Sequence, residues 1–249
     1  ELKLKGVTVD FTGCHGFCQR GPIVDIGQEH VFYAEVKADD VPEIVQSHLV
    51  QGEVVNRLLY RHPVTGEALT HSQDIPFYSR QQRLILRNCG HINPERIEDY
   101  LSAGGYEALK KTLNRMAPEK VIDEVKRSGL RGRGGAGFPT WQKWNVCRMV
   151  PGTEKYLICN ADEGDPGAFM DRSVLEADPH SVLEGMLIAA YAIGANHGYI
   201  YVRAEYPLAV NRFGIAINEA RKHGFLGQNI LGCGFSFDIV LKEGAGAFV

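Results

Sequence analysis

The sequence predicts an α/β protein whose larger part is a layered domain with a largely parallel sheet. From residue 118 onward, helices with apolar periodicity alternate with short apolar strands, which is typical of such sheets. The predicted helices, each opened by a proline, are 118–128, 179–193 and 207–223. The predicted strands are 156–159, 198–202 and 237–241. The run Tyr156-Leu-Ile-Cys is apolar throughout, so we expect it to be buried on both faces of the sheet.

Residues 1–60 predict a smaller α/β unit. Three short β-branched or aromatic runs predict strands over 7–11, 23–26 and 30–36. Asp40 with Glu43 has the spacing of a capping box and predicts a helix through Leu49.

The rest of the chain divides into a predicted linker and the larger domain. Residues 61–80 are polar, hold two prolines and have no period, so they predict a linker. Residues 82–87 resemble a strand, and residues 94–101 and 106–113 two short helices. The expected organisation is therefore 1–60, 61–80 and 81–249.

Composition excludes several classes of function. Of the 249 residues, 44% are hydrophobic and 23% charged, and the net charge of −3 gives no global attraction to nucleic acid. The longest apolar stretch, 186–194, is too short to cross a membrane, so we expect no direct membrane insertion. Six cysteines without regular pairing suit a reducing cytoplasm. A chain that begins with Glu1 is expected to be a fragment or a processed form.

The stretch 129–144 is the most informative part of the chain. Arg131, Arg133 and Lys143 supply positive charge, while Phe138 and two tryptophans supply flat apolar faces. Bare amides and cations form a cradle for phosphate, and aromatic rings suit a ring system, so the stretch predicts a nucleotide site. Five glycines in nine residues allow positive φ: Gly129, Gly132, Gly134, Gly135 and Gly137.

Three other interpretations of this stretch are open. The spacing Gly132-x-Gly134-x-x-Gly137 resembles a Rossmann fingerprint, but a predicted helix rather than a strand precedes it. A flexible surface loop does not suit the nearby apolar residues Leu130, Phe138, Trp141, Trp144 and Val146. An Arg-Gly-Gly segment that binds RNA would repeat, whereas this one occurs once.

A second candidate site follows the strand at 156–159 directly, where α/β sheets place their ligands. Asp162, Glu163 and Asp165 put three carboxylates in four residues, next to Asn160. Such carboxylates repel one another unless a metal or the donor groups of a flavin or ribose are present. A bare acidic turn is the alternative, and a metal is disfavoured because no histidine lies nearby.

A third candidate is the pair Cys14 and Cys18 in a glycine-bordered loop. Two thiolates at this spacing could hold half of an iron–sulfur cluster or a zinc ion, or could be two buried thiols. Cys89 is distant in sequence. Three further cysteines lie among apolar neighbours and are expected to be inert: Cys147, Cys159 and Cys233.

Several of these motifs together resemble a known family. The stretches 129–144, 160–172, Asp178-Pro-His, 198–207 and 244–248 are similar to the NADH- and FMN-binding flavoprotein subunit of respiratory complex I. Residues 1–60, with Cys14 and Cys18, resemble the second half of a thioredoxin-like [2Fe–2S] domain. The fusion of both modules is most similar in type to the flavoprotein subunit of soluble NAD(P)-linked, often electron-bifurcating, iron hydrogenases.

The resemblance implies a fold and a set of site residues. The fold is a partial thioredoxin-like domain followed by a Rossmann-like α/β FMN/NADH-binding domain with a non-classical glycine loop. Cys14 and Cys18 match the second pair of cluster ligands, with the first pair expected upstream of Glu1. Phe138 would stack on the nucleotide and Lys143 reach the flavin. The remaining residues implied to bind cofactor are Gly132, Arg133, Gly134, Gly135, Ala136, Gly137, Asn160, Asp162, Glu163, Asp165, Gly244, Gly246 and Phe248.

This sequence departs from the family pattern at three positions. Asp165 replaces the usual Glu near the nicotinamide nucleotide, and Phe248 replaces a Tyr near the flavin. Val146 stands where some members have a second aromatic for the adenine. The family's Cys-Gly-Glu-Glu loop and its later [4Fe–4S] module are not in this sequence. The departures at Asp165 and Val146 leave the preference for NADH over NADPH open.

The implied function is an FMN-dependent NAD(P)H oxidoreductase subunit. It would pass electrons from NADH to FMN and then singly to iron–sulfur clusters, with no catalytic side chain assigned because the flavin carries the chemistry. The implied partners are a small thioredoxin-like [2Fe–2S] subunit and a large cluster-bearing or hydrogenase subunit. The alternatives are a formate dehydrogenase or NADH:quinone oxidoreductase subunit, a degenerate scaffold, and a non-redox nucleotide- or RNA-binding module.

Overall fold

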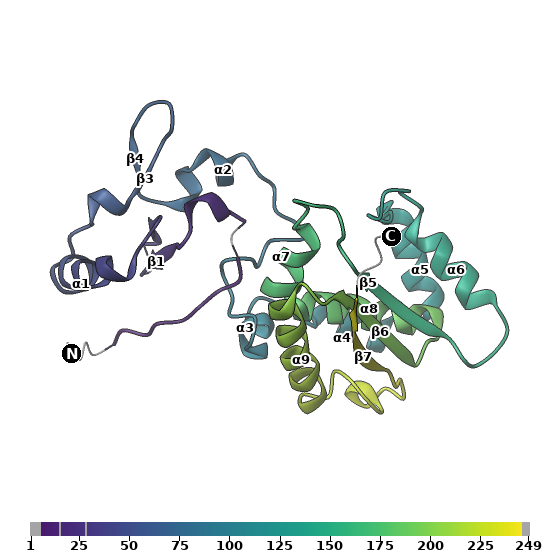
Figure 1. The fold of residues 1–249 in the computed structure, drawn as a ribbon. Helices are drawn as coiled ribbons and strands as arrows, with labels where there is room; N and C mark the ends of the chain where they lie inside the picture. Colours follow the sequence, from purple (N-terminus) through teal and green to yellow (C-terminus); the bar gives the residue numbers. More distant parts are fainter. Residues whose placement is uncertain (1–5, 15, 28, 246–249) are drawn as a thin grey trace. The chain divides into compact units, whose positions relative to one another are not determined.

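The structure is a computed structural model that describes residues 6–14, 16–27 and 29–245 (Figure 1). The chain divides into two compact units, one of Glu1–Gly13 with Asn88–Val249 and one of Cys14–Arg87. The α/β class predicted from the sequence is confirmed in the larger unit, which holds three parallel strands and seven α-helices in its described residues.

The larger unit alternates helices and strands as predicted. In the described residues, no helix is both long enough and apolar enough to cross a membrane. Its helices are α3 (Ile97–Ser102), α4 (Glu107–Arg115), α5 (Pro118–Ser128), α6 (Thr140–Met149), α7 (Met170–Ala177), α8 (Pro179–Ile193) and α9 (Pro207–Lys222). Its strands are β5 (Tyr156–Ala161), β6 (His197–Arg203) and β7 (Asp238–Gly244), with a short 3₁₀ turn at Ile230–Gly232.

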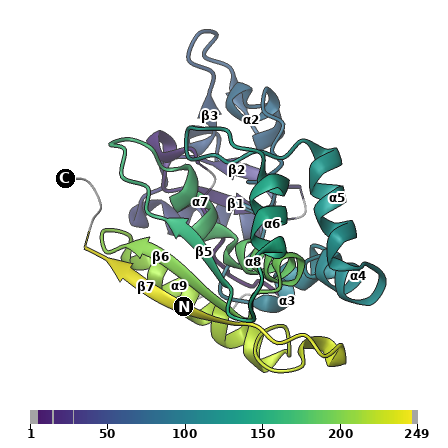
Figure 2. The same cartoon turned by 90° about the vertical axis from the view of Figure 1, so that its right-hand side faces the viewer.

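The sheet has the order β5-β6-β7, and both pairs are parallel. Its register pairs Ile158 with Tyr199 and Tyr199 with Val240. Because strand order follows chain order, right-handed crossovers bring α8 and α9 to the same face (Figure 2). Ile200 and Phe213 are fully buried in the core between this face and the helices.

The expectation that residues 156–159 are buried on both faces is wrong. β5 is an edge strand, and Tyr156 and Ile158 are 50% and 67% exposed. The helices between the strands cover one face of the sheet, so alternate β5 side chains meet solvent on the other. Val240 on β7 is exposed on the sheet too.

The predicted helix ends are confirmed at glycines. α5 ends before Gly129 with φ 69°, and α8 ends before Gly194 with φ 80°. Both glycines adopt the left-handed conformation that closes a helix without a Cβ penalty. At Gly129 this closure starts the glycine-rich stretch directly after α5.

A buried carboxylate ties α3 and α4 to α8. Glu184 accepts hydrogen bonds from the Tyr100 hydroxyl at 2.6 Å and from the backbone amides of Tyr106 and Leu109 at 2.9 Å. These partners satisfy a charge that would otherwise cost several kcal/mol to bury. Burial, followed by the hydrogen bond to Glu184, raises the pKa of Tyr100 well above its ordinary value.

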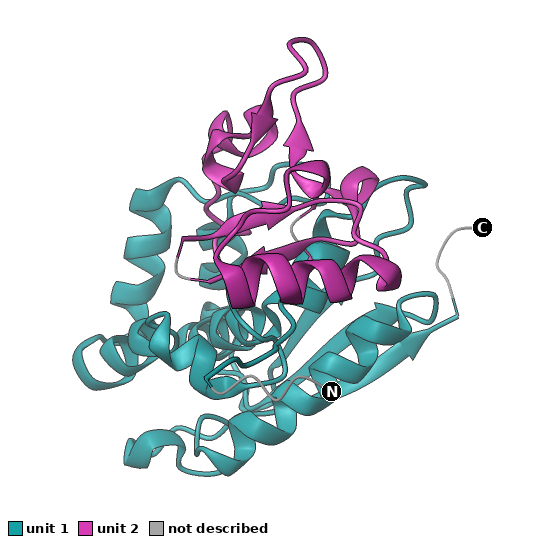
Figure 3. Cartoon of the chain, turned by 90° about the vertical axis from the view of Figure 1, so that its left-hand side faces the viewer, with its two compact units in different colours: residues 1–13, 88–249 teal, residues 14–87 magenta. Residues whose placement is uncertain are grey.

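The smaller unit holds two antiparallel strand pairs and short helices (Figure 3). Phe32 and Tyr33 are fully buried in its two apolar clusters. Its strands are β1 (Val24–Ile26), β2 (Val31–Tyr33), β3 (Tyr60–Arg61) and β4 (Ala68–Leu69). Its helices are α1 (Val41–Glu43), the π-helical Ile44–Val50, α2 (Pro76–Ser79) and four 3₁₀ turns at Cys18–Arg20, Ala38–Asp40, Asn56–Leu58 and Ser72–Asp74.

The expected linker over 61–80 belongs instead to this smaller unit. β3 and β4 form a hairpin, and Ile75 is fully buried beside Tyr78. These two side chains, three residues apart, anchor the segment in the core. The polar composition of the rest of the segment gave no sign of this anchoring.

Two predicted strands are absent among the described residues. Residues 7–11 are irregular, and the Asp10 carboxylate in this segment accepts from Asn93 Nδ2 at 2.7 Å. Residues 82–87 lack strand structure and include a turn, with Leu84 and Ile85 exposed.

The buried His180 makes stability depend on pH. Its side chain is 2% exposed, and Nδ1 lies 2.9 Å from the Tyr106 hydroxyl. Burial lowers the pKa of His180 from 6.5 to about 4. Between these values the unfolded chain takes up a proton that the folded chain refuses, so stability should fall as pH falls from 6.5 to 4, by up to about 3 kcal/mol.

Urea unfolding at a series of pH values measures this slope. His180→Gln, which does not titrate, should flatten it, whereas His197→Gln at an exposed position should leave it as it is. A slope unchanged in His180→Gln would contradict the assignment.

Candidate functional site

The three strands of the sheet end at one edge. β5 ends at Ala161, β6 at Arg203 and β7 at Gly244, and the register pairs Ala161 with Val202 and Arg203 with Gly244. Parallel strands therefore bring the segments after 161 and 203, and the end of β7, to the edge where open α/β sheets bind ligands. Figures 1 and 2 show the loop between α5 and α6 on the same side of this unit.

The loop between α5 and α6 holds the five predicted glycines. Its base is closed by backbone bonds from Gly132 N to Phe138 O at 2.9 Å and from Thr140 N to Leu130 O at 3.1 Å. Beyond this closure, residues 131–136 are exposed. The loop is thus a short hairpin that projects bare backbone.

Its backbone conformation requires glycine at some positions and not at others. Gly135 has φ 97° and Gly137 has φ 59°, both left-handed, whereas Gly134 has no positive φ. A Cβ built at Gly134 or Gly135 meets nothing within 4 Å. The face of the loop at these two residues is therefore open, with room for a flat ligand against the backbone.

Cations border this open face. Arg133 Nη1 donates to the Arg131 carbonyl oxygen at 2.7 Å, and Lys143 Nζ lies 5.5 Å from the centre of the Phe138 ring. Phe138 is 42% exposed, so one aromatic surface remains accessible. Bare amides, three cations and an exposed ring can hold a phosphate and a planar group together.

The two tryptophans do not offer free faces, contrary to the interpretation from sequence. Trp141 and Trp144 are half-buried and pack against Val121, Ile122 and Ala192. Lys126 Nζ lies 4.6 Å from the centre of the Trp141 ring. Helical spacing turns both side chains toward α5 and α8, so they hold the helices together.

The acidic loop over 160–169 begins in the last two residues of β5. Asn160 Oδ1 accepts from the Asp162 amide at 3.2 Å, and the Asp165 carbonyl accepts from the Ala168 amide at 3.1 Å. The Asp165 carboxylate is exposed and has no hydrogen-bond partner within the described residues. Asp165 is therefore positioned on a turn where it can meet a ligand.

Glu163 differs from its acidic neighbours because both its carboxylate oxygens are used. They accept from the amides of Asp171 and Arg172, each at 3.1 Å, at the first turn of α7. A carboxylate there satisfies free amides and opposes the positive end of the helix. Its predicted contact with a flavin stays a prediction. In the structure, the Glu163 carboxylate caps the N-terminus of α7.

Other residues at this edge were not assigned from sequence. Arg203 and Tyr206 both contact Glu163, and the available signal was their position just after the predicted strand 198–202. Cys159 fits the expectation of an inert thiol, because burial raises its pKa to about 11.

Cys14 and Cys18 lie in the smaller unit, and both are exposed. Phe17 between them stacks on Phe77 with 4.5 Å between ring centres, which anchors the loop, and the Gly16 amide donates to Cys14 Sγ at 3.3 Å. The described part of the chain has no group of three or more metal-ligating side chains. Two thiols therefore stand as candidate ligands, while Cys89 is buried in the larger unit.

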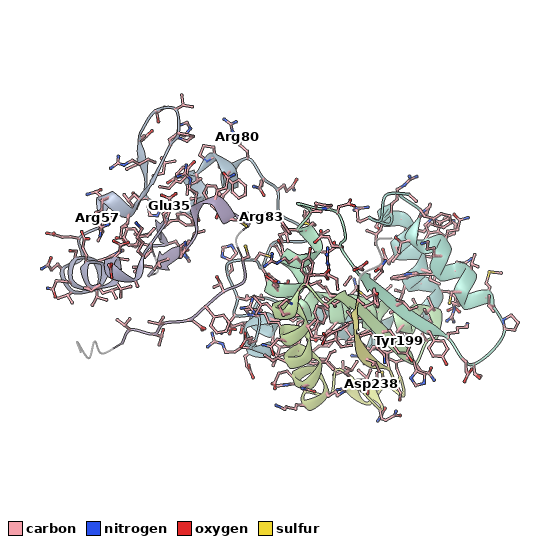
Figure 4. All side chains as sticks on the ribbon, viewed as in Figure 1. Glu35, Arg57, Arg80, Arg83, Tyr199 and Asp238 are labelled. Atoms are coloured by element: carbon pink, nitrogen blue, oxygen red, sulfur yellow. The ribbon has the colours of Figure 1, made fainter. Side chains whose placement is uncertain are left out.

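A hollow of about 220 Å³ in the smaller unit is lined by Arg20, Glu35, Arg57 and Tyr60 among others. Arg20 pairs with Glu35 at 3.1 Å, and Arg57 pairs with Asp40 at 2.7 Å (Figure 4 labels Glu35 and Arg57). Acidic side chains neutralise these two arginines, while a third arginine of the lining, Arg61, donates to the Gly66 carbonyl oxygen at 3.3 Å.

Comparison with known proteins places these features in a family. The family described as Nuo51 FMN-binding domain matches residues 125–249, which include the glycine loop, the acidic loop and the whole sheet. The chain belongs to this family.

The relatives of this Nuo51-type chain are subunits of redox enzymes. It is 61% identical over 170 residues to the HndC subunit of the NADP-reducing hydrogenase of Solidesulfovibrio fructosivorans, covering 68% of this chain and 34% of the relative. It is 52% identical over 166 residues to a subunit of the NADH-quinone oxidoreductase of Aquifex aeolicus, covering 67% and 38%. The chain thus spans about a third of the length of these relatives.

A solved structure is similar over most of the chain. It is an NAD+-reducing [NiFe]-hydrogenase in the H2-reduced state, with 28% identity and a TM-score of 0.50. The match covers 88% of this chain and 33% of the hydrogenase chain.

The end of β7 is the last part of the candidate site that the structure describes. A Cβ at Gly244 would lie 2.3 Å from the Tyr201 side chain, so a larger residue there would require that ring to move. Gly246 and Phe248, both predicted to bind cofactor, lie outside the described residues.

Gly134 and Gly135 form a matched pair for testing the cradle. Gly135→Ala forces a left-handed alanine and should destabilise the loop by about 1 kcal/mol, whereas Gly134→Ala should leave urea unfolding unchanged. Both should weaken FMN binding, because each added methyl group projects into the open face. Titration of apo-protein by flavin fluorescence measures this, and unaltered affinity in both variants would exclude a cradle here.

Proposed function

We propose that this chain is the FMN- and NAD(P)H-binding part of a flavoprotein subunit that feeds electrons singly into iron–sulfur clusters. The observation that carries the proposal is the arrangement at one sheet edge. A bare glycine loop bordered by cations and an acidic loop after β5 lie on the side where the strands end. Membership of the Nuo51 FMN-binding family and the names of the relatives support it.

The residues at this edge fit such a cofactor. Gly134 and Gly135 leave open space above the loop, and Arg131, Arg133 and Lys143 provide charge for a phosphate. When bound, FMN supplies the conversion from two-electron hydride transfer to single-electron transfer. The protein's part is to hold the phosphate, orient the ring system and place the nicotinamide nucleotide beside it.

The electron path from this site would lead to clusters carried in part by partners. Cys14 and Cys18 provide two exposed thiols, and a [2Fe–2S] centre needs four ligands. The partners we propose are a small thioredoxin-like [2Fe–2S] subunit and a large cluster-bearing or hydrogenase subunit, in a cytoplasmic assembly. The names of both relatives mark them as subunits of larger assemblies.

The full-length protein tests this function. It should purify with FMN, reduce ferricyanide with NADH or NADPH, and show a reduced [2Fe–2S] signal in electron paramagnetic resonance that Cys18→Ser abolishes. Assays of the copurified complex with hydrogen, formate and quinone then identify the acceptor. A full-length protein that binds RNA but no flavin would instead favour a non-redox module.

Asp165 should control the choice between NADH and NADPH. An exposed carboxylate near the adenosine ribose accepts from its 2′-hydroxyl and repels a 2′-phosphate. Asp165→Asn should therefore raise the NADPH/NADH ratio of kcat/KM by a few-fold to about a hundredfold, the range for a lost repulsion of about 1–3 kcal/mol.

The exposed Asp39 in the smaller unit offers a matched control, and Asp39→Asn should leave the ratio unchanged. An unchanged ratio in Asp165→Asn, with healthy NADH turnover, would place the selectivity at other residues.

A further inference from the structure

The hydroxyl of Tyr206 lies within hydrogen-bond distance of three oxygen atoms of the acidic loop over 160–169. Tyr206, directly before α9, is 6% exposed. Its hydroxyl lies 3.4 Å from the Glu163 carbonyl oxygen, 3.3 Å from Glu163 Oε2 and 3.5 Å from the Ala168 carbonyl oxygen. Since a hydroxyl carries one proton, it shares that proton among three acceptors and links the start of the loop to its end.

Arg203, the last residue of β6, also binds the backbone of Glu163. Its Nη1 donates to the Glu163 carbonyl oxygen, and its guanidinium carbon lies 5.2 Å from the centre of the Tyr206 ring. Arg172 on α7 lies 5.5 Å from the same ring centre. The Tyr206 ring is thus in contact with two guanidinium groups, which orients its hydroxyl toward the loop.

Glu163 connects these two residues to α7. Its backbone carbonyl is bound by Arg203 and Tyr206, while its carboxylate accepts from the amides of Asp171 and Arg172. One residue therefore joins the end of β6, the acidic loop and the first turn of α7. Asp162 and Asp165 lie in the same loop, on either side of Glu163.

We propose that Arg203 and Tyr206 are positioning residues for the cofactor site: they act through Glu163 to hold the acidic loop in the shape that binds flavin and nucleotide. This rests on the proposed function, because the loop needs a defined shape for binding only if it meets a ligand. Neither side chain has to touch the cofactor. Arg203 is paired with Glu205 at 3.0 Å, and Tyr206 is buried.

Tyr206→Phe tests this with minimal change, since it keeps the ring between the guanidinium groups and removes the hydroxyl alone. Tyr191→Phe is the matched control: the Tyr191 hydroxyl also donates to a backbone carbonyl, that of Met116, at 2.8 Å in another part of the unit. Arg203→Met removes the second donor. Arg203→Lys retains a cationic donor and should recover part of what Arg203→Met loses.

The measurements use the full-length protein. Hydrogen exchange of the amides of residues 162–172 should speed up at least tenfold in Tyr206→Phe and in Arg203→Met. The dissociation constant of FMN, from quenching of flavin fluorescence on titration of apo-protein, should rise at least tenfold in both. In Tyr191→Phe both quantities should stay within twofold, even where the unfolding midpoint falls as far as in Tyr206→Phe.

The outcomes separate this proposal from the proposed function. FMN affinity and loop exchange that are unchanged in Tyr206→Phe and Arg203→Met, in a protein that binds FMN, would overturn the positioning role alone. If Tyr191→Phe lost FMN affinity and loop protection to the same extent, the effect of Tyr206→Phe would be one of general stability, and the positioning role would be overturned. If the unsubstituted full-length protein binds no FMN, the proposed function fails, and the positioning role fails with it.

Discussion

Parallel pairing of three strands in chain order is the constraint on which the larger unit depends. It requires a crossover between each pair of strands, and right-handed crossovers that advance in one direction bring α8 and α9 to one face. The same pairing aligns the ends of β5, β6 and β7 at one edge. Residues separated by more than 40 positions, such as Glu163 and Tyr206, meet there for this reason.

Two buried carboxylates, one in α8 and one directly before it, fasten other elements to this helix. Glu184 receives three donors from α3, α4 and the turn between them, and the Asp178 carboxylate accepts from Asn88 at 2.7 Å. Removing a partner from such a group is strongly destabilising, although the intact pair adds little net stability. These contacts fix where α3 and α4 lie, so their value lies in specifying one arrangement.

The candidate site combines two kinds of loop with different requirements. The glycine loop needs freedom from side chains, and its exposed backbone is closed by two hydrogen bonds at its base. The acidic loop needs a fixed shape, and Arg203, Tyr206 and the first turn of α7 supply it through Glu163. A ligand binding there would meet one surface that is bare and one that is held in place.

The sequence by itself determined the α/β alternation, the glycine-closed ends of α5 and α8, and the existence of a bare, cationic loop, because these depend on residues close together in the chain. Only the tertiary structure decided that Trp141 and Trp144 face α5 and α8, that β5 is an edge strand, and that residues 61–80 join the smaller unit. It also turned the Glu163 carboxylate toward α7. Each of these depends on which distant element lies beside a residue, and local periodicity carries no information about that.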